Sequence, residues 1–223
     1  MKPLPEIERA SSRSKLAPRS RCELQWKDSP VTKRDRAGLK TQRPCCIWLT
    51  GLSGAGKTTL ANVLDEALHS TGRHTFVLDG DRCRDGICSD LDFSPEGRME
   101  NVRRVSEVAK LMVDAGLIVI VSLISPLIVQ RQRARKLFEP GEFLEVYLNT
   151  PLATCEQRDA KGLYKKARQG IIPDFTGISS AYEPPESPEL VLNGEAAISD
   201  LLRQMLQVLK QPVDLEAVCL KAS

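Results

Sequence analysis

The sequence predicts a three-layer α/β fold in which a five-stranded parallel sheet lies between layers of helices. Short apolar runs alternate along the chain with segments of helical periodicity, the pattern that βαβ units produce. Residues 117–121 form a nearly continuous apolar run, which is typical of a strand buried on both faces of a parallel sheet. With 223 residues, the chain is long enough for one sizeable core plus short appendages.

The expected elements follow from these patterns in chain order. Apolar runs predict strands at 45–50, 75–78, 117–121, 143–148 and 189–192. Helical patterns predict helices at 57–70, 95–115, 127–138, directly after residue 151, at 161–169 and at 195–209. Ser94-Pro95 begins the second helix, because serine caps a helix and proline fits its first position. Loops are expected up to Ser94 and over 170–188.

Charge divides the chain unevenly. Residues 1–43 hold twelve Lys/Arg and five Asp/Glu, whereas the other 180 residues carry a net charge of −4. We therefore expect a basic, flexible arm at 1–43, one folded domain at 44–210 and a loose tail at 211–223. An organelle-targeting arm is the alternative, although Glu6 and Glu8 count against it. No nucleic-acid partner is expected, because the positive excess lies outside the folded body.

Two features indicate a cytoplasmic protein without a membrane partner. The longest apolar run, 117–124, is too short to cross a bilayer, and the N-terminus lacks the apolar core of a secretion signal. Seven cysteines occur without a Cys-x-x-Cys pair or histidines at zinc-ligand spacing, which favours reduced thiols. A redox link between Cys83 and Cys88 is the minor alternative.

A glycine-rich motif predicts a phosphate cradle. It matches GxxxxGK[ST] over Gly51, Leu52, Ser53, Gly54, Ala55, Gly56, Lys57 and Thr58. Glycines let several backbone N–H groups point at one phosphate, and the following helix adds the positive end of its dipole. Lys57 reaches the β- and γ-phosphates, and the Thr58 hydroxyl ligates Mg²⁺. We expect ATP as the nucleotide, because the guanine-reading pattern NKxD is absent from the sequence.

Asp79 and Asp81 follow the second predicted strand, and ligands gather at the carboxyl ends of parallel strands. One carboxylate could serve Mg²⁺ while the other takes the proton of an acceptor hydroxyl during phosphoryl transfer. The alternative is a simple Asp-Gly-Asp turn. The neighbouring cradle favours the functional interpretation.

Three polar residues could hold an anionic acceptor. Arg98 and Asn101 share one helix face, and Arg84 lies in the preceding loop. Arginine binds phosphate and sulfate groups bidentately. A solvated surface position is the alternative for each arginine.

Two loop aromatics and a basic stretch complete the candidates. Phe93 and Phe175 could stack a base, or they could instead rest on the core. The stretch from Lys161 to Arg168 could be a mobile lid over phosphates or a solvated helix face.

From about residue 26 to 210 the chain resembles the adenylyl-sulfate kinases (APS kinases). The resemblance lies in GLSGAGKT (51–58), LDGD (78–81), ENVRRVSEVAKLMVDAG (100–116), ISP (124–126), RDAKGLYKKAR (158–168) and FTGISSAYEPPESPE (175–189). It implies a P-loop fold and transfer of the ATP γ-phosphoryl group to the 3′-hydroxyl of adenosine 5′-phosphosulfate (APS). We also expect Mg²⁺, a homodimer and a functional link to an ATP sulfurylase.

The resemblance implies a role for each candidate residue. Asp81 would be the base and Asp79 would lie near the metal. Phe93 and Phe175 would sandwich the adenine of APS. The other acceptor-binding residues would be Arg84, Arg98, Asn101, Ile124, Ser125, Lys161, Thr176 and Gly177. Ser125 stands where the family is often described as carrying a phosphoserine, although direct in-line transfer needs no covalent step.

The chain departs from the usual family pattern around the expected acceptor pocket. The departures are Arg82, Asp85, Gly97, Leu123 and Leu127. They bear on acceptor affinity more than on the class of reaction. One alternative is therefore a kinase for another nucleotide-like hydroxyl, and a second is a non-catalytic nucleotide-binding regulator of sulfate activation.

Overall fold

The computed structural model describes residues 30–209. Within them, parallel strands form a five-stranded sheet in the order β2-β3-β1-β4-β5, which confirms the predicted fold class. The strands are β1 (Cys45–Thr50), β2 (Thr75–Asp79), β3 (Ile118–Ser122), β4 (Phe143–Asn149) and β5 (Leu190–Asn193). The helices are α1 (Lys33–Leu39), α2 (Lys57–Ser70), α3 (Gly80–Asp85), α4 (Pro95–Asp114), α5 (Ile128–Arg135), α6 (Leu152–Arg158), α7 (Leu163–Arg168) and α8 (Ile198–Leu209).

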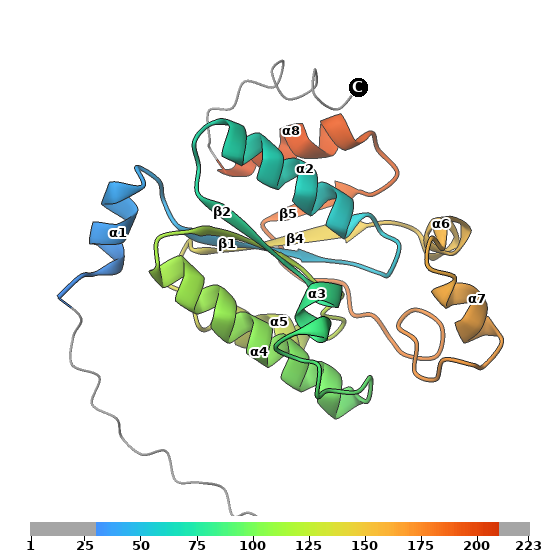
Figure 1. The fold of residues 1–223 in the computed structure, drawn as a ribbon. Coiled ribbons are helices and arrows are strands. Elements are labelled where there is room, and N and C mark those ends of the chain that lie inside the picture. Colours follow the sequence, from blue (N-terminus) through green and yellow to red (C-terminus); the bar gives the residue numbers. More distant parts are fainter. Residues whose placement is uncertain (1–29, 210–223) are drawn as a thin grey trace, which may run out of the picture. The chain divides into compact units, whose positions relative to one another are not determined.

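The central strand β1 contributes to an apolar layer on each face of the sheet, because successive side chains of a strand point to opposite faces. Ile47 and Leu49 pack into the layer that includes α2 and α8. Cys46 and Trp48 pack into the layer that includes α4 and α5. Figure 1 shows these two pairs of helices on opposite sides of the sheet.

The predicted elements agree with the structure to within three residues at each end. The start of α4 shows why the sequence signal was clear there. Pro95 occupies the first turn, and the Ser94 hydroxyl accepts a hydrogen bond from the Gly97 N–H at 3.0 Å.

One predicted loop is wrong in its first part. The segment after β2 continues directly into α3 instead of forming a turn and a loop. The Asp79 carboxylate accepts a hydrogen bond from the Asp81 N–H at 3.0 Å and so caps this short helix. Asp81 therefore lies in the first turn of a helix, which fixes its backbone next to the cradle.

The described part of the predicted arm, residues 30–43, contains a helix that the sequence analysis did not predict. Thr32 and Asp35 form a reciprocal capping box at the start of α1. Lys33 donates to Glu142 on the neighbouring segment, at 2.5 Å. The rest of the predicted arm and the predicted 211–223 tail lie outside the described residues.

Two further predictions concern membranes and cysteines. Among residues 30–209, no helix combines the length and apolar character that a membrane crossing requires. The described cysteines are buried, and burial raises the pKa of the Cys83 thiol to about 11. A buried thiol of this kind is a poor nucleophile.

Candidate active site

The glycine-rich motif forms the connection between β1 and α2, as a phosphate cradle requires. Gly56 precedes the first residue of α2 with a φ of 103°, a conformation that glycine adopts without strain. A Cβ atom on Gly51 would lie 2.7 Å from the Leu148 carbonyl oxygen. These two positions therefore need glycine, one for its backbone angle and one for the close approach of β4.

Side chains from other elements hold the carbonyl groups of the cradle. The Tyr164 hydroxyl donates to the Ser53 carbonyl at 2.8 Å, and the Thr150 hydroxyl donates to the Ala55 carbonyl at 2.9 Å. Arg158 also donates to the Ala55 carbonyl, at 3.3 Å. In a planar trans peptide the C=O and the following N–H point in opposite directions. Holding the Ser53 and Ala55 carbonyls therefore orients the N–H groups of Gly54 and Gly56.

Lys57 lies inside the cradle with only 8% of its surface exposed. Its ammonium group donates to the Gly51 carbonyl at 2.9 Å and to the Leu52 carbonyl at 2.7 Å. Burial lowers the pKa of Lys57 to about 8, because a low-dielectric site disfavours the charged form. The side chain is thus held within the loop that would receive the phosphates.

This pKa predicts how nucleotide affinity depends on pH. Lys57 loses its charge as the pH rises through about 8, instead of near the usual value of 10.5. The Kd for ADP should therefore increase above pH 8, by up to about tenfold per pH unit, because the uncharged amine attracts phosphate weakly. Calorimetric titrations between pH 7 and 9.5 measure this change.

The matched control is Lys57→Arg, since a guanidinium stays charged over this range. Its ADP affinity should show no break near pH 8, even if binding is weaker. A wild-type Kd that stays constant up to pH 9.5 would contradict the role of the Lys57 charge.

The predicted metal ligands Thr58 and Asp79 lie together. The Thr58 hydroxyl donates to the Asp79 Oδ2 at 2.9 Å, across the gap between the start of α2 and the end of β2. Hydroxyl and carboxylate oxygens suit Mg²⁺, which usually takes few protein ligands and completes its shell with water and phosphate oxygens. Among residues 30–209, no group of three or more acidic, histidine or cysteine side chains is placed to hold a metal ion.

The predicted base contacts the predicted lid. Lys161, in the connection between α6 and α7, forms an ion pair with the Asp81 carboxylate. Both side chains are mostly exposed, so solvent screens the pair and an incoming substrate can replace either partner. Lys161 is therefore solvent-exposed, although it stands in the connection before α7 and not on a helix face.

Arg98 and Asn101 of α4 lie at the expected acceptor side. Arg98 donates from Nη1 to the Thr176 hydroxyl at 3.1 Å, so the helix contacts the loop before β5. Asn101 is 4% exposed, and its Nδ2 has no hydrogen-bond partner among the described residues. An unpaired buried amide is costly, and a ligand oxygen would satisfy it.

The two predicted stacking aromatics have different partners in the structure. Phe93 is 65% exposed, and the guanidinium carbon of Arg84 lies 4.2 Å from the centre of its ring. Phe175 is 9% exposed and packs edge-on against Tyr164, with the ring centres 5.0 Å apart. Phe93 is thus open to a ligand, whereas Phe175 presents only a small part of its surface.

Ser125 is buried, with 2% of its surface exposed. Its hydroxyl accepts a hydrogen bond from the Trp48 indole N–H at 3.0 Å and donates to the Thr50 hydroxyl at 3.2 Å. Thr50 in turn donates to the Ile124 carbonyl at 2.7 Å. The proton and a lone pair of Ser125 are therefore already engaged in these two hydrogen bonds.

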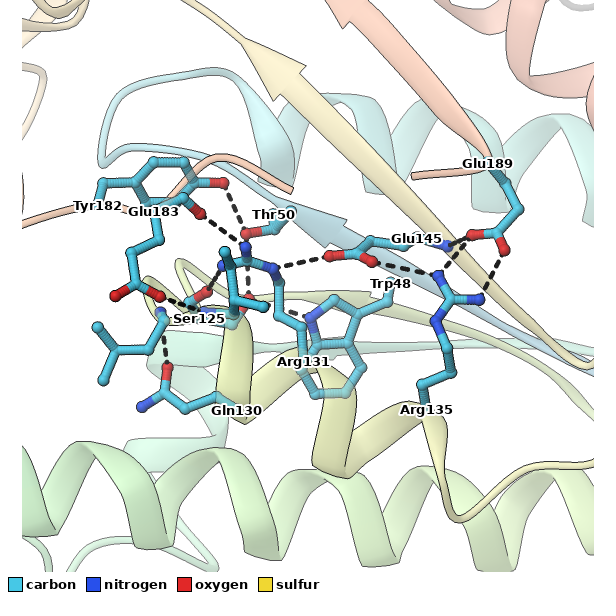
Figure 2. Close-up of polar contacts among 12 residues, drawn as sticks. Trp48, Thr50, Ser125, Gln130, Arg131, Arg135, Glu145, Tyr182, Glu183 and Glu189 are labelled. Atoms are coloured by element: carbon cyan, nitrogen blue, oxygen red, sulfur yellow. Dashed lines mark hydrogen bonds and ion pairs between the residues drawn. The ribbon is translucent and has the colours of Figure 1, made fainter. Parts of the chain in front are cut away.

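A buried arginine network supports this turn, and sequence reasoning missed it. Arg131 of α5 is 2% exposed and donates to the Ser125 carbonyl, the Glu145 carboxylate and the Glu183 carbonyl (Figure 2). Tyr182 completes it through a 2.9 Å hydrogen bond with the Thr50 hydroxyl. Glu183 lies within the FTGISSAYEPPESPE block, but no local pattern marks Arg131.

Two other supporting residues lie within a sequence block that resembles the family. Arg158 and Tyr164 belong to the RDAKGLYKKAR block, of which only the lysines and Arg168 were interpreted. Their contacts with the cradle carbonyls explain why an arginine and a tyrosine stand among those lysines.

The structure explains why glycine stands at position 97, where the sequence departs from the usual family pattern. A Cβ atom there would lie 2.4 Å from Asp92 Oδ1 and 2.6 Å from the Asp92 carbonyl oxygen. Asp92 instead approaches the helix start closely, and its carboxylate accepts a hydrogen bond from the Ser94 N–H at 3.1 Å. Its carbonyl accepts one from Arg84 at 3.2 Å. The glycine thus admits the loop that carries Phe93 and that contacts Arg84, which lies in α3 and not in the loop expected from the sequence.

We expect Gly97→Ala to weaken acceptor binding selectively. The new methyl group must displace Asp92, and with it the Arg84 contact and the neighbouring Phe93. The KM for the acceptor should rise about tenfold, since one displaced charged hydrogen bond is worth about 1.5 kcal/mol or more. Steady-state kinetics with each substrate varied in turn measure it.

The KM for ATP should change less than twofold in the same variant, because the cradle does not contact Asp92. Equal rises in both KM values would contradict a local effect.

Comparisons with known proteins agree with this geometry. The family model described as adenylylsulphate kinase matches residues 43–193. The adenylyl-sulfate kinase of Marinobacter nauticus is 53% identical over 187 residues, which are 83% of this chain and 94% of that protein. The adenylyl-sulfate kinase of Citrobacter koseri is 54% identical over 186 residues, 83% and 92% of the two chains.

Solved structures show the same relationship. The APS kinase CysC of Mycobacterium tuberculosis, in complex with AMPPNP and APS, is 44% identical with a TM-score of 0.73, over 76% of this chain and 99% of that one. A hexameric APS kinase from Thiobacillus denitrificans is 30% identical with a TM-score of 0.57, over 79% and 31%. The chain therefore belongs to the adenylylsulphate kinase family and is an ATP-dependent kinase.

Proposed function

We propose that this chain transfers the γ-phosphoryl group of ATP to the 3′-hydroxyl of APS, giving 3′-phosphoadenosine 5′-phosphosulfate and ADP. The observation that carries the proposal is the hydrogen bond between Thr58 and Asp79, because it brings the cradle against the acidic start of α3. A phosphate donor and a hydroxyl acceptor can then meet at one place, as in-line transfer requires. The complex of the M. tuberculosis relative with AMPPNP and APS supports both substrates.

On the donor side, Lys57 and the N–H groups of residues 51–58 would hold the β- and γ-phosphates. Thr58 and Asp79 would hold Mg²⁺, which neutralises phosphate charge when bound. The outer hydrogen bonds from Tyr164, Thr150 and Arg158 support this role, because they fix loop N–H groups before substrate arrives.

On the acceptor side, Asp81 would take the proton of the 3′-hydroxyl as its oxygen bonds to the γ-phosphorus. The bond from that phosphorus to the bridging oxygen breaks, and the electron pair leaves with ADP. Lys161 would exchange its contact with Asp81 for the charge on the transferred group. Arg84, Arg98 and Asn101 would bind the acceptor, with Phe93 and Phe175 against its adenine.

We propose that Ser125 positions the turn at 124–126 and carries no phosphate. A nucleophilic hydroxyl needs a base and access to the phosphorus. Ser125 is buried and bonded to a tryptophan and a threonine instead. Its carbonyl, which accepts from Arg131, supports a positioning role.

The experiment is an ADP-release assay with ATP, Mg²⁺ and a panel of nucleotide acceptors, followed by chromatography of the product. APS should give ADP and a 3′-phosphorylated product at a rate well above that of the other nucleotides. Faster turnover of another acceptor would favour the kinase of a different nucleotide-like hydroxyl. ATP binding without any ADP release would favour the non-catalytic regulator.

Several partner assignments stay predictions. A homodimer is our expectation for this chain, and light scattering of the purified protein tests it. The functional link to an ATP sulfurylase and the cytoplasmic location remain inferences from the sequence.

A further inference from the structure

We infer that Tyr164 is a positioning residue that couples occupation of the phosphate cradle to placement of the acceptor's adenine. This inference rests on the proposed function, because it assumes that Phe175 contacts that adenine. Tyr164 lies at the start of α7 and is 2% exposed, so solvent does not reach its contacts. One end of the side chain contacts the donor site, and its ring contacts the acceptor side.

The hydroxyl end controls one peptide group of the cradle. It donates to the Ser53 carbonyl at 2.8 Å. That carbonyl and the Gly54 N–H belong to one planar peptide unit and point in opposite directions. The direction of the Gly54 N–H, one of the loop donors, is thus linked to the position of the tyrosine. Burial raises the pKa of the Tyr164 hydroxyl, so it remains a donor at neutral pH.

The ring end contacts the acceptor side. The rings of Tyr164 and Phe175 meet edge to face, at 75° and with centres 5.0 Å apart. The backbone of α7 is itself held, since Asp159 accepts hydrogen bonds from the N–H groups of Tyr164 and Lys165, each at 3.0 Å. The tyrosine thus has contacts at its backbone, its ring and its hydroxyl. Because the hydroxyl is bonded to the loop peptide, a shift of that peptide also shifts the ring that packs against Phe175.

A second contact joins the cradle to the loop that contains Phe175, but it is apolar and does not orient a peptide group as the Tyr164 hydrogen bond does. Gly177 has a φ of 91°, and a Cβ atom there would lie 3.0 Å from the Leu52 side chain. The loop with Phe175 thus rests on the cradle through apolar contact. This apolar contact does not involve the tyrosine hydroxyl, whereas the hydrogen bond that orients the Gly54 N–H does.

Coupling of this kind is reciprocal, because each ligand changes the affinity of the other by the same factor. A nucleotide that accepts from the Gly54 N–H fixes the Ser53 peptide and, through it, Tyr164 and Phe175. The acceptor then binds to a site that is already ordered, so its binding free energy no longer includes the loss of conformational entropy. The expected sign is positive: nucleotide strengthens acceptor binding.

The test compares Tyr164→Phe with the wild type. Calorimetry would measure the Kd for APS alone and with a saturating non-hydrolysable ATP analogue. We expect the analogue to tighten APS binding about fivefold or more in the wild type and less than twofold in the variant. The Kd for APS alone should stay within twofold of wild type, since the variant keeps the ring against Phe175.

Tyr147→Phe is the matched control. The Tyr147 hydroxyl donates to the exposed Asn149 side chain, so its removal should leave the wild-type ratio unchanged. The quantity compared is the Kd for APS alone divided by the Kd for APS with the analogue. The inference would be overturned if this ratio in Tyr164→Phe were within twofold of wild type, or if the wild-type ratio were near one. Melting temperatures of the three proteins show whether either substitution disturbs the fold.

The same preparations separate this inference from the proposed function. If the wild type phosphorylates APS but Tyr164→Phe retains full coupling, only the role of Tyr164 fails. If the wild type neither binds nor phosphorylates APS, the proposed function fails and the inference fails with it.

Discussion

Lys57→Ala should lower kcat/KM about 10²- to 10³-fold, the usual cost of removing one preorganised group that stabilises transition-state charge. The reason is that Lys57 supplies the positive charge within a cradle otherwise made of backbone N–H groups. Because the side chain is buried, water cannot readily replace that charge in the variant. Initial-rate measurements with ATP, Mg²⁺ and APS give the effect directly.

The folded state should survive this substitution. The change leaves the Gly51 and Leu52 carbonyls without their lysine partner, which costs about 1–3 kcal/mol for a buried group. A domain of this size usually has more stability than that. Lys110→Ala is the control, because Lys110 lies on α4 and pairs with Asp114. A Lys57→Ala protein that melts normally and turns over within tenfold of wild type would refute the cradle role.

Asp81→Asn should lower kcat about 10²- to 10⁴-fold, the range associated with a general base. Asparagine has nearly the same shape but cannot accept the proton of the acceptor hydroxyl. The substitution also removes the ion pair with Lys161, but that pair is exposed and contributes at most about 1 kcal/mol to stability. A pre-steady-state measurement of product formation separates chemistry from product release.

Nucleotide affinity distinguishes a lost base from a disturbed site. The Kd for ADP should stay within twofold in Asp81→Asn, because Thr58 and Asp79 keep their own hydrogen bond. Asp200→Asn on α8 is the control, since Asp200 pairs only with Arg203 among the described residues. An Asp81→Asn enzyme with normal kcat would require another group to take the proton.

The fold was predictable because each element has a local signal. The β1 run is buried on both faces and is apolar up to its last residue, Thr50, and α4 begins with a serine cap and a proline. The exceptions are α1 and α3, whose short sequences carry few apolar residues. Capping by Thr32 and Asp79 starts them, and packing on the rest of the protein retains them.

The site was predictable only in part. The cradle, Asp79, Asp81, Arg98 and Asn101 could be named because their residue types match a known chemistry at a known spacing. The surroundings of Phe175 and Ser125 could not be foreseen. Ser125 meets Trp48 from 77 residues away, and Phe175 meets Tyr164 across the turn between α7 and its own loop, so no spacing rule connects either pair.

The sequence by itself determined the reaction class, because phosphate binding depends on consecutive backbone N–H groups and one adjacent lysine, all within eight residues. Tertiary structure alone decided how that loop is held. Tyr164, Thr150 and Arg158 reach its carbonyls from segments about a hundred residues away. The physical reason is that a hydrogen bond depends on distance and direction in space, and only the folded sheet brings those segments to the same edge.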